Sequence, residues 1–64
     1  MTPKFYNNLL YYCLSIRDSS ESAETLAKEF FTKFNNLSKW NQVNLSLIID
    51  SDGFEKAFEE IENL

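Results

Sequence analysis

The apolar positions of residues 20–36 recur at helical spacing and predict an amphipathic helix. At about 100° per residue, one arc collects most of the apolar side chains, namely Ala23, Leu26, Ala27, Phe30 and Phe34, with Phe31 at its edge. The opposite arc carries the polar and charged side chains: Glu24, Lys28, Glu29, Thr32 and Lys33. We therefore expect this helix to face a core with its apolar arc.

The last segment, residues 53–63, has the same two-sided character. Its apolar stripe consists of Phe54, Ala57, Phe58 and Ile61. Four carboxylates face away from the centre of that stripe: Glu55, Glu59, Glu60 and Glu62. This pattern predicts a second amphipathic helix with an acidic outer face.

Residues 3–16 form a less regular helical pattern. A helix here gathers Phe5, Leu9, Tyr12, Cys13 and Ile16 on one face, and Leu10 and Leu14 widen the stripe. Tyr11 falls instead on the polar side, among Lys4, Asn7, Asn8 and Ser15. A large aromatic side chain on the polar side of a helix is a candidate contact residue.

The segment around residues 40–49 is ambiguous between helix and strand. A helix places Trp40, Val43, Leu47 and Ile48 on one side, with Leu45 and Ile49 on another. A strand alternates Val43, Leu45, Leu47 and Ile49 with their neighbours. Periodicity alone does not separate the two for so short an apolar run.

Polar residues at fixed offsets mark the expected helix ends. Thr2-Pro3 is typical of a cap followed by proline at the first helical position. Asp18 and Asp52 each precede a glutamate by three residues, which is capping-box spacing, and Ser19, Ser20 and Ser22 are alternative caps beside Asp18. Asn35-Asn36 predicts a helix stop, because asparagine tolerates the left-handed conformation, and Ser38 is a further candidate cap.

These segments predict an all-α fold, a small three- to four-helix domain spanning residues 1–64 as a single domain. The alternative is an α/β fold with two short strands near residues 9–16 and 43–49. One glycine and one proline supply little turn chemistry, and a two-stranded sheet would leave both edges unpaired. The all-α fold is therefore favoured.

Charge narrows the choice of partners. The net charge of −4 opposes nonspecific binding to nucleic acids and anionic membranes, and suits a protein with a basic surface. No basic region followed by an apolar run marks a signal peptide, and the apolar run 9–14 is far too short to cross a bilayer. We expect a cytoplasmic protein that does not bind membranes.

The chemistry of the side chains argues against an enzyme. The chain has no histidine, a single cysteine at Cys13 and no glycine-rich phosphate loop, so we expect no catalytic residue and no cofactor. Asp50-Ser51-Asp52-Gly53 resembles part of an EF-hand calcium loop, but Ile48 stands where the first aspartate belongs. A helix start at Asp52 accounts for the same residues, and no metal site is predicted.

Contact through aromatic side chains is the function that the sequence favours. Ten residues are aromatic, and the core stripes account for about half of them. We expect Tyr6, Tyr11, Tyr12 and Trp40 to bind a protein partner, while Glu55, Glu59, Glu60 and Glu62 steer its basic surface. Such a protein would act as an adaptor, a steric inhibitor or a regulator, and the many residues with A/T-rich codons suggest a phage or mobile-element origin.

Two alternatives belong to other classes. A dimeric helical DNA-binding regulator would use the polar run Lys39, Asn41, Gln42 and Asn44, since Asn and Gln read adenine. Only Lys33 and Lys39 lie nearby to contact phosphates, which disfavours nucleic acid as the partner. A structural subunit of a homo-oligomer is the other alternative, and a homodimer is compatible with the surplus of apolar side chains.

Overall fold

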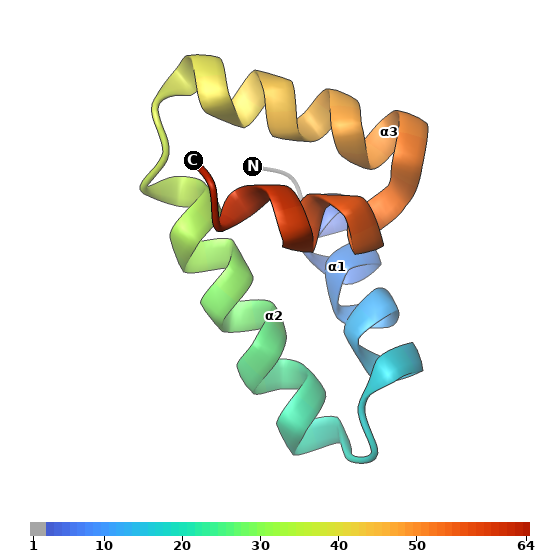
Figure 1. The fold of residues 1–64 in the computed structure, drawn as a ribbon. Helices are drawn as coiled ribbons and strands as arrows, with labels where there is room; N and C mark the ends of the chain where they lie inside the picture. The colour runs from blue at the N-terminus through green and yellow to red at the C-terminus, as the bar shows by residue number, and fades with distance from the viewer. Residues whose placement is uncertain (1–2) are drawn as a thin grey trace. The chain divides into compact units, whose positions relative to one another are not determined.

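A computed structural model describes residues 3–64 and contains three α-helices: α1 (Pro3–Ile16), α2 (Ser20–Asn35) and α3 (Lys39–Ile61) (Figure 1). The described residues contain no strand. The predicted all-α fold is therefore confirmed. Segments 9–16 and 43–49 are both helical, so the α/β alternative is wrong.

Gly53 divides α3 into two arms, residues 39–52 and 54–61. Its backbone has φ 85° and ψ 177°, which is far from helical geometry and is tolerated only by glycine. Figure 1 shows α3 turning sharply between these arms. The two predicted C-terminal helices are therefore the two arms of one kinked element. This is why the structure has three helices where the sequence pattern has four helical segments.

The chain divides into two compact units, Met1–Phe31 and Thr32–Leu64. Unit 1 contains α1 and most of α2, and unit 2 contains the last turn of α2 and all of α3. The single domain over residues 1–64 stays a prediction.

Serine hydroxyls cap two of the helices. The Ser19 Oγ accepts a hydrogen bond from the Ser22 N–H at 3.1 Å, so Ser19 caps α2 in place of the predicted Asp18. Ser38 has extended backbone geometry, and its Oγ accepts from the Asn41 N–H at 3.2 Å, which confirms the predicted cap of α3. The predicted cap at Thr2 lies outside the described residues.

The end of α2 is held by a side chain from α3. No residue other than glycine has a positive φ among the described residues, so the helix does not stop through a left-handed asparagine as predicted. Instead, the Gln42 Nε2 donates to the carbonyl oxygens of Phe34 at 3.1 Å, Leu37 at 3.2 Å and Asn35 at 3.5 Å. The Phe34 carbonyl also accepts from the Leu37 N–H at 3.1 Å. Carbonyl groups at the end of a helix lack the donor four residues on that they have inside it, and the Gln42 amide supplies one. Gln42 thus fixes the angle at which the chain leaves α2.

The buried side chains follow the predicted stripe of α2 closely. In unit 1 they are Leu9, Cys13, Ala23, Ala27 and Phe30. Cys13, Ala23 and Ala27 have small side chains, which allow the backbones of α1 and α2 to approach closely. Ile16, predicted on the same face as Leu9, is 51% exposed because α1 ends there.

In unit 2, the buried side chains are Phe34, Leu45, Ala57 and Ile61. The first arm of α3 buries Leu45 completely and leaves Trp40, Val43 and Leu47 largely exposed. The sequence pattern grouped the last three on one side correctly, but that side faces solvent. Phe54 and Phe58, predicted as core, are half-buried.

Candidate functional site

The three tyrosines of α1 lie in different surroundings. Tyr6 is half-buried and packs edge to face against Phe31, with ring centroids 5.3 Å apart and planes at 82°. Tyr12 is also half-buried. Tyr11 is 77% exposed and stands on the polar side of α1, as predicted. Of the three predicted tyrosine anchors, Tyr11 alone presents most of its ring to solvent.

A second exposed apolar surface runs along the first arm of α3. We call it the Trp40 stripe: Trp40, Val43 and Leu47, exposed by 73%, 53% and 60%. Their spacing of three and four residues places them on one face of the helix. Trp40 was a predicted anchor, whereas Val43 and Leu47 were not. The helical spacing of these residues predicts that they share one face, but it does not show whether that face points into the core or into solvent.

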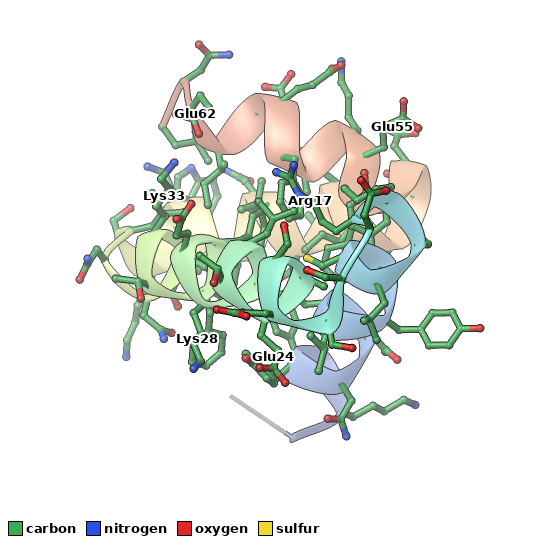
Figure 2. All side chains as sticks on the ribbon, turned by 90° about the horizontal axis from the view of Figure 1, so that it is seen from below. Arg17, Glu24, Lys28, Lys33, Glu55 and Glu62 are labelled. Carbon is green, nitrogen blue, oxygen red and sulfur yellow. The ribbon has the colours of Figure 1, made fainter. Side chains whose placement is uncertain are left out.

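Three of the four predicted steering glutamates lie on the second arm of α3, and Glu62 follows its last residue. Lysines form ion pairs with three of the four. Lys33 pairs with Glu62 at 2.7 Å, and Lys56 lies 3.8 Å from Glu59 and 3.5 Å from Glu60. Figure 2 shows Lys33 beside Glu62, with Glu55 toward the opposite end of the arm. Unit 2 carries six carboxylates and three lysines, so its formal charge is −3. Lysines of the same unit therefore partly neutralise the acidic surface, and Glu55 is the one of the four glutamates without an ion pair among residues 3–64.

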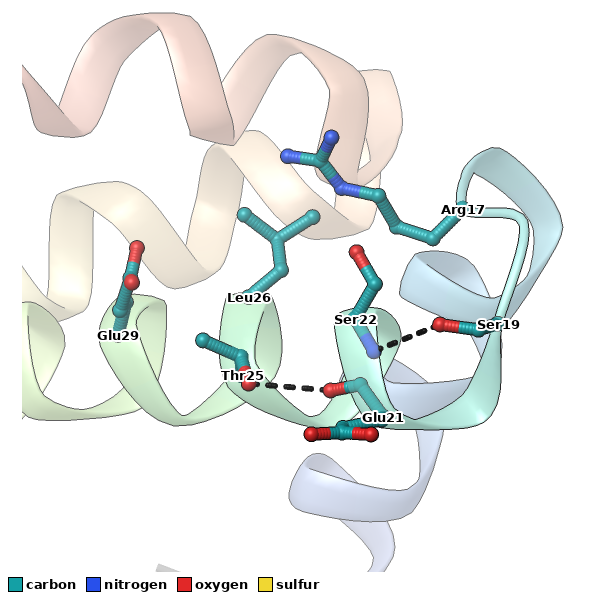
Figure 3. A pocket seen from close by; sticks show the side chains of 7 residues that line it. All are labelled: Arg17, Ser19, Glu21, Ser22, Thr25, Leu26 and Glu29. Atoms are coloured by element: carbon teal, nitrogen blue, oxygen red, sulfur yellow. Dashed lines mark hydrogen bonds between the residues drawn. The ribbon is translucent and has the colours of Figure 1, made fainter.

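Unit 1 also contains a shallow hollow of about 440 Å³, open to solvent. Figure 3 shows its lining residues: Arg17, Ser19, Glu21, Ser22, Thr25, Leu26 and Glu29. The Ser19 hydroxyl already caps α2, and the Thr25 hydroxyl donates to the Glu21 carbonyl at 3.0 Å. Two carboxylates outweigh the one guanidinium, so the hollow is a poor site for an anion.

Cys13, the single thiol, is fully buried. Burial raises the pKa of this thiol, and the positive charge of Arg17 offsets part of the effect. A thiol with a raised pKa stays protonated at neutral pH and is a weak nucleophile. Cys13 therefore packs as a small apolar side chain.

The residues considered for reading DNA bases lie at the start of α3. The Gln42 amide nitrogen is engaged by the carbonyls at the end of α2, and the Asn41 N–H donates to the Ser38 cap. The amide of Gln42 therefore has a structural role that competes with base contacts.

Residues 3–64 contain neither a cluster of metal ligands nor a helix suited to spanning a membrane. No group of three or more acidic, cysteine or histidine side chains lies close enough there to hold a metal ion. Asp50-Ser51-Asp52 is helical, so this segment is not the loop that an EF-hand requires. None of the described helices combines the length and apolar character needed to cross a bilayer.

Comparison with protein-family models, with curated proteins and with solved structures finds no match to this chain. The features of the chain that bear on its function are therefore the exposed Tyr11, the Trp40 stripe and the acidic second arm of α3.

Proposed function

We propose that this protein is a small acidic contact module, acting as an adaptor, a steric inhibitor or a regulator of a protein partner in the cytoplasm. One observation carries the proposal. Tyr11 and Trp40 are the most exposed large apolar side chains among the described residues, at 77% and 73%. Tyrosine and tryptophan dominate binding energy at protein interfaces, because they combine a large contact area with a polar group.

The charges support a partner with a basic surface. The chain carries a net charge of −4, and Glu55 is exposed and has no ion pair among residues 3–64. Long-range attraction of this kind raises the rate of encounter more than the final affinity. Mechanistically, the aromatic side chains would anchor the partner, while the carboxylates would orient it. A phage or mobile-element origin, suggested by composition alone, would suit a protein that acts by blocking another protein.

Affinity capture with the tagged protein from an extract of the encoding organism tests this function. We expect the wild-type chain to retain a specific partner, which is then purified. The affinity for that partner should fall about 30-fold or more on Tyr11→Ala or Trp40→Ala, as for a true hot spot. Thr32→Ala, at an exposed polar position of α2, is the matched control. Wild-type affinity in both aromatic variants, with their fold verified by circular dichroism, would reject the proposal.

A further inference from the structure

The Trp40 stripe is flanked by two opposite charges that have no ion pair among residues 3–64. Lys39 stands just before the stripe, Asp50 stands just after it, and both are exposed. Eleven residues of helix separate them, which corresponds to about 16 Å along the axis. Their helical positions differ by only about 20° around the axis, so both lie on the same flank of the stripe.

From this arrangement we infer that the Trp40 stripe is a self-association surface, on which a second copy of the chain docks its own stripe in antiparallel orientation. The inference deepens the proposed function, because it names the occupant of one of its surfaces. It rests on that proposal only in treating exposed apolar side chains as contact residues. Tyr11 lies outside this surface and serves the protein partner alone, whereas Trp40 serves the second copy in the dimer and the protein partner in the monomer.

The charges select the orientation. A two-fold axis near residues 44 and 45 would bring Lys39 of each copy beside Asp50 of the other, on the same flank of the interface. In a parallel pair the two-fold axis runs along the helices, so the flanks that carry Lys39 and Asp50 lie on opposite sides of the interface and these charges do not meet. The charges on the first arm of α3 are thus complementary to those of a second copy in antiparallel orientation.

The apolar side chains fit the same register. With the axis between residues 44 and 45, Val43 of one copy falls beside Leu47 of the other. Trp40 then lies between Leu47 and Asp50 of the partner copy, where its ring covers apolar surface at the edge of the stripe. Side chains at spacings of three and four residues are those that meet when two helices pack at a small crossing angle.

The size of the stripe sets the expected strength. Three partly exposed side chains per copy offer far less area than the roughly 1,200 Å² in total that stable interfaces bury. The dimer should therefore be weak, forming between about 10 µM and 1 mM protein. Such an affinity would let another protein or a high local concentration control the oligomeric state.

Sedimentation equilibrium of the pure full-length chain tests the inference without any other partner. The mass should rise from 7.5 kDa toward twice that value across this concentration range. Emission from Trp40, the single tryptophan, should shift to shorter wavelength in parallel as its ring is buried. Trp40→Ala should raise the dissociation constant about tenfold or more, whereas Tyr11→Ala, an equally exposed aromatic of unit 1, should change it by less than about twofold.

A charge swap tests the orientation. Lys39→Glu and Asp50→Lys should each weaken self-association about five- to tenfold, because each creates two like-charge contacts. Mixing the two variants should restore association, since each unlike pair across the mixed dimer is again attractive.

Three results would overturn the inference: a chain that stays at 7.5 kDa at millimolar concentration, a dimer unaffected by Trp40→Ala, or a mixture of the charge variants that fails to associate. Loss of partner capture in Tyr11→Ala with an intact dimer would separate the proposed function from this inference, because the two use different variants and different measurements.

Discussion

The two arms of α3 are built on the same amphipathic plan but present opposite surfaces to solvent. Residues 39–52 bury Leu45 and expose Trp40, Val43 and Leu47, whereas residues 54–61 bury Ala57 and Ile61 and carry exposed charges. Exposed large apolar side chains are found on the first arm and not on the second. The second arm thus shows that a helix of this unit folds without large exposed apolar side chains, since its Phe54 and Phe58 are half-buried. The apolar outer face of the first arm is not a requirement of folding, which is why we assign it to contact.

The arms also differ in how they are tied to the end of α2. The first arm uses the neutral amide of Gln42, which is hydrogen-bonded to three carbonyl groups in a half-buried setting. The second arm uses the exposed ion pair between Lys33 and Glu62. Hydrogen bonds in a shielded site keep their strength, whereas exposed ion pairs are weakened by water and salt. The first arm should therefore be the more firmly held.

The inward and outward faces of the first arm offer the strongest test of this comparison. Leu45→Ala removes a fully buried side chain and should lower the free energy of unfolding by about 2–5 kcal/mol. Leu47→Ala, two residues further along, should change it by less than about 1 kcal/mol, because its side chain is 60% exposed. Urea denaturation followed by circular dichroism measures both. Equal losses would show that Leu47 is also a core residue and would remove the basis for a contact surface.

Substitution of Gly53 tests whether the two arms need their kink. Gly53→Ala should lower the free energy of unfolding by about 1–3 kcal/mol, because an alanine is strained at φ 85° and ψ 177°. A Cβ at this position would meet no neighbouring atom within 4 Å, so the loss reports backbone strain alone. Thermal unfolding of this variant beside Ser51→Ala, an exposed neighbour, gives the comparison. An unchanged melting temperature would mean that the arms can join as one straight helix.

Removal of the Gln42 amide tests the attachment of the first arm. Gln42→Ala should lower the free energy of unfolding by about 1 kcal/mol, because the Leu37 carbonyl loses the Gln42 donor and the Phe34 carbonyl keeps only the Leu37 N–H. Gln42→Glu should cost at least as much, since a carboxylate cannot donate to these carbonyls and adds like charge at the negative end of the helix dipole. Equilibrium unfolding measures both variants. A Glu variant as stable as the wild type would contradict the role of Gln42 as a cap.

The smallest effect belongs to the attachment of the second arm. A double-mutant cycle with Lys33→Met and Glu62→Gln should give a coupling energy of about 0.2–1 kcal/mol, because both side chains are more than half exposed. The coupling should vanish in 1 M salt, where screening acts over about 3 Å. A coupling of several kcal/mol that persists in salt would reverse the ranking of the two attachments.

The sequence predicts most of the helices but not the directions of their faces. Residues 20–35 have one apolar arc and one charged arc, so Phe30 and Phe34 were correctly expected inside. Residues 40–49 have apolar side chains all round, and periodicity could not decide that Leu45 faces in while Trp40 faces out. That choice depends on packing between segments distant in the chain, which no local pattern contains.

Local hydrogen bonds were predicted with similar limits. Ser38 was expected as a cap from its position, and it is one. At the start of α2, two acceptable caps stand side by side, and Ser19 is used in place of Asp18. The donor at the end of α2 comes from seven residues beyond Asn35, and the spacing of Gln42 gave no signal for it. The burial of Tyr6 was likewise not predictable from local sequence. Its edge-to-face contact with Phe31 depends on how α2 packs against α1.

The two attachments at the end of α2 should form one after the other during folding. Gln42 meets the Phe34 carbonyl across eight residues of chain, whereas Glu62 meets Lys33 across 29. Closing the longer loop costs about 1 kcal/mol more in chain entropy, and short loops close sooner. We expect the first arm to assemble on α2 early and the C-terminal arm to join last. In transient local unfolding the order reverses. Residues 54–61 should detach from the rest of unit 2 first, so Ile61 should be the first core side chain of that unit to become exposed to solvent.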